Sequence, residues 1–223
     1  MPTVLAKYSP PDVPLDVLFE DDTLLVLNKP SGLLSVPGKA DDHKDCMESR
    51  AKAIFPDALL IHRLDMETSG VFLMARTKEA QRHLGLQFEH RNAKKTYIAR
   101  VWGTPRDREG QIDLPLICDW PNRPKQMVDH EKGKKAITNW SVLAGESIGA
   151  IQVTRMELKP ETGRSHQLRV HMLAIGHPIL GDQLYAPEEA LKAAPRLQLH
   201  AKSLTILHPD KKDFMTFEAE IPF

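Results

Sequence analysis

The sequence has little cysteine and no long apolar run. Its two cysteines, Cys46 and Cys118, lie far apart and form neither a metal-ligand pattern nor a disulfide framework, which is typical of a reducing compartment. No stretch is long enough to cross a bilayer, and the proline-rich start (1–14) acquires acidic residues where a signal peptide has basic and apolar regions. We therefore expect a cytoplasmic protein with no membrane partner.

Net charge is lacking too, because 30 basic and 30 acidic residues cancel. Total charge therefore does not indicate a nucleic-acid partner, and only its distribution can. A solvated surface explains any single lysine equally well. Two groups of basic residues nevertheless stand out. The first consists of Lys94, Lys95, Arg100, Arg155, Lys159, Arg164 and Arg169. The second consists of Arg123, Lys125, Lys132, Lys134 and Lys135.

The chain also lacks repeats and low-complexity tracts, and its length suits one compact domain, so we expect a single catalytic domain over 1–223. Apolar patterning predicts strands and helices in irregular alternation. The strands are expected at 23–27, 71–75, 97–101, 138–142, 197–201 and 215–219, and the helices at 45–55 and 78–90. Consecutive strands with irregular connections indicate an α+β fold, with a mixed, mainly antiparallel sheet flanked by helices.

A single carboxylate, Asp65, stands in the segment 62–70 between two apolar runs. This position predicts a half-buried acid on a structured loop, with Ser69 and Gly70 forming a turn ahead of the next strand. An isolated Arg-Leu-Asp triplet is more often a structural ion pair, here between Arg63 and Asp65. Other motifs must therefore decide whether the acid is catalytic.

A further helix is predicted over 162–175, with Thr162 as its N-cap and Gly176 just after its end. Spacings of four and three residues place a mixed stripe on one face, namely Arg164, Leu168, His171 and Ile175. An arginine at the head of such a stripe either snorkels to solvent or partners a buried carboxylate.

Three motifs resemble, in order, those of the RluA family of pseudouridine synthases. They are His-Arg-Leu-Asp followed by Thr-Ser-Gly at 62–70, a tyrosine motif at 94–103 and an arginine motif at 158–172. Segments 28–34, 116–126 and 176–182 match as well, so the resemblance spans nearly the whole chain. It implies the pseudouridine synthase fold, with a sheet in two halves around a central cleft. The first match comes too early to leave room for an N-terminal S4 domain.

The resemblance implies isomerisation of uridine to pseudouridine in RNA, without a cofactor. The bond from C1′ to N1 breaks, the uracil turns, and C1′ bonds to C5. Asp65 is the implied catalytic group; it can attack C1′, attack the uracil ring or remove a sugar proton, and the sequence leaves these three open. Arg63 is implied to fill the gap left by the flipped base. Tyr97 contacts the uracil and Arg164 keeps Asp65 ionised.

The same resemblance adds Leu168 to the substrate site and expects a monomer acting on loops of large-subunit rRNA, the tRNA anticodon stem-loop, or both. No metal site is expected, because His166 and His171 are five residues apart and no ligand pair accompanies them. The residues expected to contact RNA are His62, Lys94, Lys95, Arg123, Lys125, Arg169 and His171.

Two rival functions stay open at this point. A glycoside or N-ribosyl hydrolase also uses a carboxylate at an anomeric carbon, but it normally needs a second one, for which Glu67 is the nearest candidate. A non-catalytic RNA-binding or RNA-folding protein has no need of Asp65, Tyr97 and Arg164 together. The product separates the hydrolase from the pseudouridine synthase, since a hydrolase releases the free base and an isomerase retains it.

Overall fold

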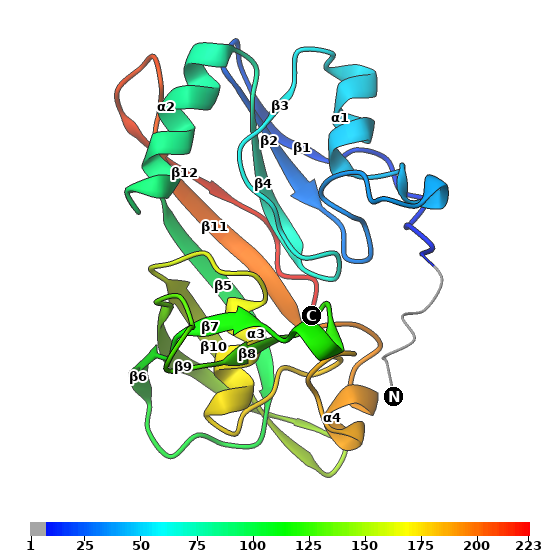
Figure 1. Ribbon diagram of the computed structural model, residues 1–223, viewed down its shortest axis with the longest axis vertical. Helices are drawn as coiled ribbons and strands as arrows, with labels where there is room; N and C mark the ends of the chain where they lie inside the picture. The colour runs from blue at the N-terminus through cyan, green and yellow to red at the C-terminus, as the bar shows by residue number, and fades with distance from the viewer. Residues whose placement is uncertain (1–7) are drawn as a thin grey trace. The chain divides into compact units, whose positions relative to one another are not determined.

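The computed structural model describes residues 8–223, so the first half of the proline-rich start lies outside the described residues (Figure 1). The chain divides into two compact units. The aspartate unit contains residues 8–95 and 200–222, and the arginine unit contains residues 96–199 with Phe223. Within residues 8–223, no helix is long and apolar enough to span a bilayer.

The aspartate unit is built on a sheet in which β4 pairs with β2 on one side and with β3 and β11 on the other. The pairing of β4 with β11 is parallel, and those of β1 with β2, β2 with β4, β3 with β4 and β11 with β12 are antiparallel. The elements are β1 (Val17–Glu20), β2 (Leu24–Lys29), a 3-10 turn η1 (Asp41–His43), α1 (Met47–Ile54), β3 (Leu59–Leu60), β4 (Ser69–Ala75), α2 (Lys78–Glu89), β11 (Leu199–Leu207) and β12 (Phe214–Glu218).

The two predicted helices of this unit are confirmed, and local caps explain where they begin. The Cys46 sulfur accepts the Ser49 amide at the start of α1, and the Thr77 hydroxyl accepts the Ala80 amide at the start of α2. Helix α2 packs its apolar face on the sheet, where Leu84 joins the buried cluster of β2 and β4 (Figure 1).

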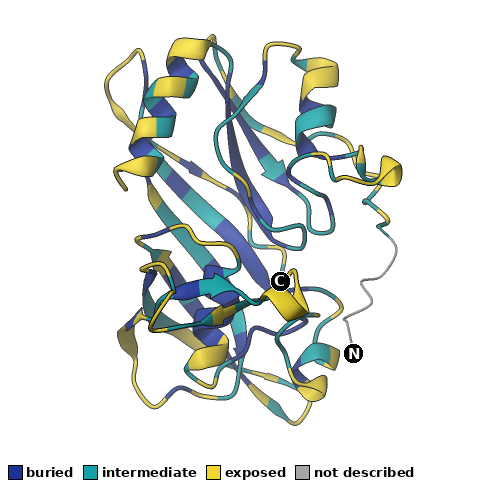
Figure 2. Ribbon diagram, in the orientation of Figure 1, coloured by how far each residue is buried: buried dark blue, intermediate teal, exposed yellow. Residues whose placement is uncertain are grey.

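The expected turn at Ser69 and Gly70 is wrong, because both residues belong to β4. All seven residues of β4 are buried (Figure 2). Gly70 lies opposite Ala201 in the parallel pair, with a φ of +109°. A Cβ at this position would come 2.2 Å from the Ala201 carbonyl oxygen, so only glycine lets the two strands meet.

The arginine unit contains an antiparallel sheet in the order β5-β10-β9-β6 and a separate hairpin of β7 and β8. Its elements are β5 (Lys94–Trp102), β6 (Glu109–Asp113), β7 (Leu116–Cys118), a 3-10 turn η2 (Trp120–Asn122), β8 (Gln126–Val128), β9 (Ile137–Ile148), β10 (Ile151–Pro160), α3 (Gln167–Ala174) and α4 (Glu188–Lys192). The predicted α+β fold with a mixed, mainly antiparallel sheet is confirmed.

The start of the third predicted helix is wrong, since α3 begins at Gln167 and not after Thr162. The Thr162 hydroxyl accepts the Ile137 amide at 2.9 Å, so it ties the segment to β9 and does not cap a helix. His166 takes a left-handed conformation with a φ of +52°, which turns the chain just before the helix. Arg164 therefore lies in the turn ahead of α3.

Candidate active site

A buried lysine supports the loop that carries Asp65. Lys29, the last residue of β2, is fully buried. Its ammonium nitrogen lies 2.9 Å from the Pro30 carbonyl oxygen, 2.8 Å from that of Met66 and 2.9 Å from that of Thr68. Hydrogen bonds from a charged donor are stronger than neutral ones, and here they satisfy a charge that is costly to bury. Lys29 therefore fixes the main chain immediately after Asp65.

A serine and a glycine add to this support. The Ser35 hydroxyl donates to the Leu64 carbonyl at 2.6 Å and accepts the Leu64 amide at 3.0 Å. The Gly32 amide donates to the Met66 carbonyl at 3.0 Å. The loop is thus held on both sides of Asp65, which is half-buried and whose carbonyl accepts the Thr68 amide.

Sequence reasoning missed these supporting residues, although one signal was available. A lysine at the end of an otherwise apolar, buried strand needs a partner, and its position in β2 could have indicated one. Ser31 belongs to the same group, because its hydroxyl lies 2.7 Å from the Glu67 carbonyl oxygen and 3.2 Å from the Glu67 carboxylate.

Replacing Lys29 with methionine should cost about 3 kcal/mol of unfolding free energy, since the buried Thr68 carbonyl and the partly buried carbonyls of Pro30 and Met66 lose their donor. Urea titration at pH 7 measures this loss. Lys202→Met is the matched control, because Lys202 lies on β11 in a more exposed pair with Glu218 and should cost less than about 1 kcal/mol. Equal losses in the two variants would contradict a supporting role for Lys29.

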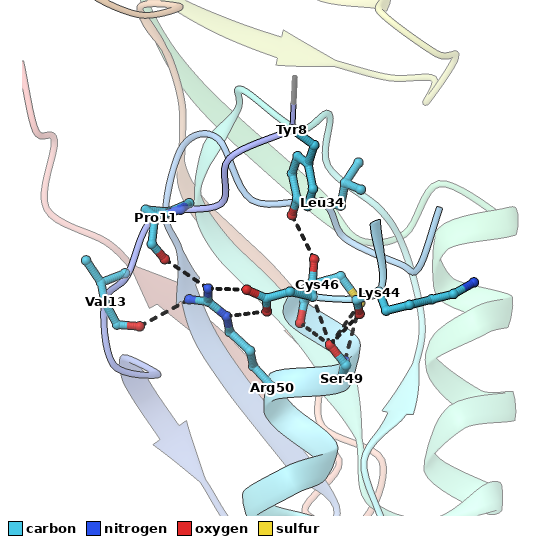
Figure 3. Close-up of polar contacts among 9 residues, drawn as sticks. Tyr8, Pro11, Val13, Leu34, Lys44, Cys46, Ser49 and Arg50 are labelled. Carbon is cyan, nitrogen blue, oxygen red and sulfur yellow. Dashed lines mark hydrogen bonds and ion pairs between the residues drawn. The ribbon is translucent and has the colours of Figure 1, made fainter. Parts of the chain in front are cut away.

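The described N-terminal segment is fastened to the same support (Figure 3). The Arg50 guanidinium forms two 2.7 Å bonds to Asp45 and donates to the carbonyls of Pro11 and Val13. The Tyr8 hydroxyl accepts the amide of Leu34, the residue before Ser35, at 3.0 Å. The segment from 8 to 13 is therefore connected to the Asp65 loop through residues 34 and 35.

His62, which was expected to contact RNA, is half-buried at the start of the loop. Its Nε2 accepts the Leu73 amide at 3.0 Å, and its ring stacks on Phe88 at a centroid distance of 4.9 Å. Burial, with a smaller effect of the Lys95 charge, lowers the pKa of His62 to about 4. The imidazole is therefore neutral at pH 7 and joins the start of the loop to β4 and α2.

Lys94 is exposed, whereas Lys95 is half-buried. Burial, together with the charge of Arg91, lowers the pKa of Lys95 to about 8. The ammonium is therefore partly deprotonated in the range where enzymes are assayed. Only the protonated form attracts phosphate.

If Lys95 contacts phosphate, RNA affinity should fall by up to about tenfold between pH 7 and pH 9, following the protonated fraction of a group with this pKa. Fluorescence anisotropy at constant salt measures the affinity. Lys95→Arg should remove the dependence, because arginine stays charged. Unfolding does not explain such a fall. Because the pKa of Lys95 is lower in the folded protein than in the unfolded chain, the folded state gains stability as pH rises between these two pKa values. The same pH dependence in Lys95→Arg would exclude Lys95 as its source.

In the arginine unit, Tyr97 lies on β5 opposite Leu158 of β10. It packs against the buried cluster that includes Leu168 of α3. Arg164 is exposed, and its Nε donates to the Lys135 carbonyl at 3.1 Å. Its amide donates to the Gln167 side-chain oxygen at 3.0 Å, which holds the turn before α3.

Two residues expected to contact RNA lie in the interior. Arg169 is 5% exposed and forms two 2.7 Å bonds to the buried Asp182 carboxylate. His171 is fully buried between the Thr138 hydroxyl and the Leu114 carbonyl, and burial lowers its pKa. Both side chains therefore make contacts inside the protein, because α3 is covered at these positions. Helical spacing alone did not indicate that.

The other two expected RNA contacts lie near the protein surface. Arg123 is exposed and Lys125 is half-buried, and both belong to the connection between β7 and β8. The Arg123 guanidinium lies 4.6 Å from the centroid of the Trp120 ring. In the part of the chain from 8 onward, no group of three or more His, Cys, Asp or Glu side chains is placed to hold a metal ion.

This arrangement is suited to chemistry by one carboxylate on a firmly held loop. A half-buried Asp65 can act as a nucleophile or as a base, and neither role needs a bound metal. Positioning by the surrounding main chain reduces the motion that a catalytic group would otherwise lose in the transition state.

Comparison with known proteins gives a consistent result. The family model described as RNA pseudouridylate synthase matches residues 23–174. Proteins named "Dual-specificity RNA pseudouridine synthase RluA" from Salmonella typhi and Escherichia coli K12 are each 56% identical over 220 residues, covering 98% of this chain and 99% of theirs. The protein of that name from Vibrio cholerae is 50% identical over 92% of this chain and 82% of its own.

Solved structures agree with the sequence matches. Human RNA Pseudouridylate Synthase Domain Containing 1 superposes with a TM-score of 0.79 at 28% identity, covering 94% of this chain and 84% of its own. Human RNA Pseudouridylate Synthase Domain Containing 4 gives 0.73 at 27% identity, covering 93% and 88%. The chain therefore belongs to the RNA pseudouridylate synthase family and is an RNA pseudouridine synthase, an isomerase.

Proposed function

We propose that this enzyme modifies uridines in both large-subunit rRNA and the tRNA anticodon stem-loop. The main support is near full-length identity of 56% to proteins named as dual-specificity synthases. The enzyme is proposed to act in the cytoplasm as a monomer, over one catalytic domain of residues 1–223, without a cofactor.

Asp65 is the proposed catalytic group, and the firmness of its loop is the observation that carries this assignment. The target uridine is flipped out of its stack, and exposed Arg63 occupies the gap. Tyr97 and Leu168 contact the uracil. Arg164 is a further proposed substrate-binding residue.

RNA recognition is proposed to rest on loop shape and phosphate contacts from Lys94, Lys95, Arg123 and Lys125. Each phosphate contact releases a counterion from the RNA, so affinity should fall steadily as salt rises. An affinity that does not change between low and high salt would argue against this group of residues.

The decisive experiment is tritium release from RNA labelled at uridine C5, using tRNA and large-subunit rRNA transcripts. Release from both supports dual specificity, and release from one restricts the enzyme to that class. Free labelled uracil would indicate hydrolysis. That rival needs a second carboxylate, and the nearest, Glu67, is bonded to Ser31. Binding without release from either RNA would support the non-catalytic alternative.

A further inference from the structure

An exposed tryptophan lies on a well-ordered turn of the arginine unit. Trp120 is 64% exposed, and the 3-10 turn η2 that carries it is exposed throughout (Figure 2). Main-chain bonds close the connection around it, from the Asn122 amide to the Asp119 carbonyl and from the Asp119 amide to the Lys125 carbonyl, both at 3.0 Å. These bonds fix the main chain that carries the exposed ring.

Arginine covers part of this ring. The Arg123 guanidinium lies 4.6 Å from the ring centroid, well within the range of a cation–π contact. A tryptophan stacked with arginine at the surface is a combination on which nucleic-acid bases stack, because every base has a π-face and arginine adds charge.

Basic residues surround the same structure, which we call the hairpin arm (residues 116–135). Lys132, Lys134 and Lys135 are exposed, and the Lys134 main chain pairs with Leu116 of β7 through two hydrogen bonds. Two acidic residues lie between these lysines and the hairpin: exposed Glu131, and Asp129, whose carboxylate accepts the amides of residues 131 and 132 within the turn. Basic residues outnumber acidic ones in the arm. The exposed charge of the arm therefore suits a polyanion.

The arm is fixed to the arginine motif. The Tyr185 hydroxyl accepts the Gln126 amide at 2.8 Å and lies 2.7 Å from Nδ1 of His166, the residue before α3. Val170 of α3 packs with Leu116 of β7, beneath the hairpin (Figure 1). A base bound on the arm would therefore be held in a fixed position relative to α3.

We infer that Trp120 and Arg123 form a stacking platform for an unpaired base of the RNA substrate, distinct from the uridine that is isomerised. This inference rests on the proposed function and adds a specificity site to it. Single-stranded loops offer such bases and paired stems do not, so the platform selects loops over duplexes. It contributes to substrate binding and not to the chemical step.

The test compares Trp120→Ala and Trp120→Phe with the native protein on a tRNA stem-loop and on a duplex of equal length. For the alanine variant, the stem-loop Kd and KM should rise about tenfold while kcat and the duplex Kd stay unchanged. Phenylalanine should retain most of the affinity. Leu143→Ala is the control, because Leu143 is 49% exposed on β9 of the same unit and should change nothing.

Fluorescence gives a readout independent of activity. Stacking of a base should quench Trp120, so the stem-loop should quench the native protein and not Trp120→Phe, which keeps Trp102 and Trp140. Native stem-loop affinity in Trp120→Ala, or equal losses on stem-loop and duplex, would overturn the inference. So would Trp120-dependent self-association in sedimentation, which would make the platform a protein contact. Absence of pseudouridine formation by the native protein would instead refute the proposed function. The stem-loop affinity and the quenching of Trp120 would then still test the stacking platform.

Discussion

Asp65→Asn is expected to lower the rate of tritium release at least about a thousandfold, with RNA binding retained. Asparagine has nearly the shape of aspartate but is neither a nucleophile nor a base at neutral pH. The contacts that hold the loop involve the main chain of residues 64, 66 and 68, so they do not depend on the carboxylate. Single-turnover kinetics with enzyme in excess measures the chemical step directly.

Glu67→Gln is the matched control for this experiment. Glu67 lies two residues from Asp65 in the same loop, and its contact with the Ser31 hydroxyl can be kept by an amide oxygen. A synthase that uses one carboxylate should lose less than about tenfold in this variant. Comparable losses in both variants would support a two-carboxylate mechanism, and near-native activity of Asp65→Asn would remove Asp65 from the chemistry.

Arg169→Met is expected to lower the unfolding free energy by about 3–5 kcal/mol, the usual cost of leaving a buried charge without its partner. Asp182 is 1% exposed, and after the substitution its carboxylate still accepts the amides of Leu184 and Tyr185 but has lost the guanidinium charge. Urea denaturation measures the loss. The double variant Arg169→Met/Asp182→Leu should recover much of it, because both charges are then removed.

Arg123→Met, in the same unit, is expected to have the opposite effects to Arg169→Met on stability and on RNA binding. Arg123 is exposed, so its loss should change stability by less than about 0.5 kcal/mol while RNA binding weakens. Under conditions in which Arg169→Met is fully folded, this variant should bind RNA with the affinity of the native protein. Weaker RNA binding by folded Arg169→Met would restore Arg169 to the RNA-contact residues.

The sequence by itself determined the fold class, the first two helices and six of the twelve strands found within residues 8–223. These follow from period-two and helical patterns and from caps a few residues away, and such signals act locally. Ordered motifs also determined the family, and they made Asp65 the candidate catalytic residue. The start of α3 lay beyond such patterns, because it depends on the bond between Thr162 and the distant Ile137.

Only the tertiary structure decided which polar residues support the Asp65 loop and which are buried or exposed. Lys29 reaches carbonyls 37 and 39 residues further along the chain, and Arg169 meets Asp182 beyond the end of its helix. Arg123 and Arg169 both belong to basic groups in the sequence, yet one is exposed and the other buried. Burial depends on which segments from elsewhere in the chain pack against a residue, and local sequence periodicity does not predict these contacts.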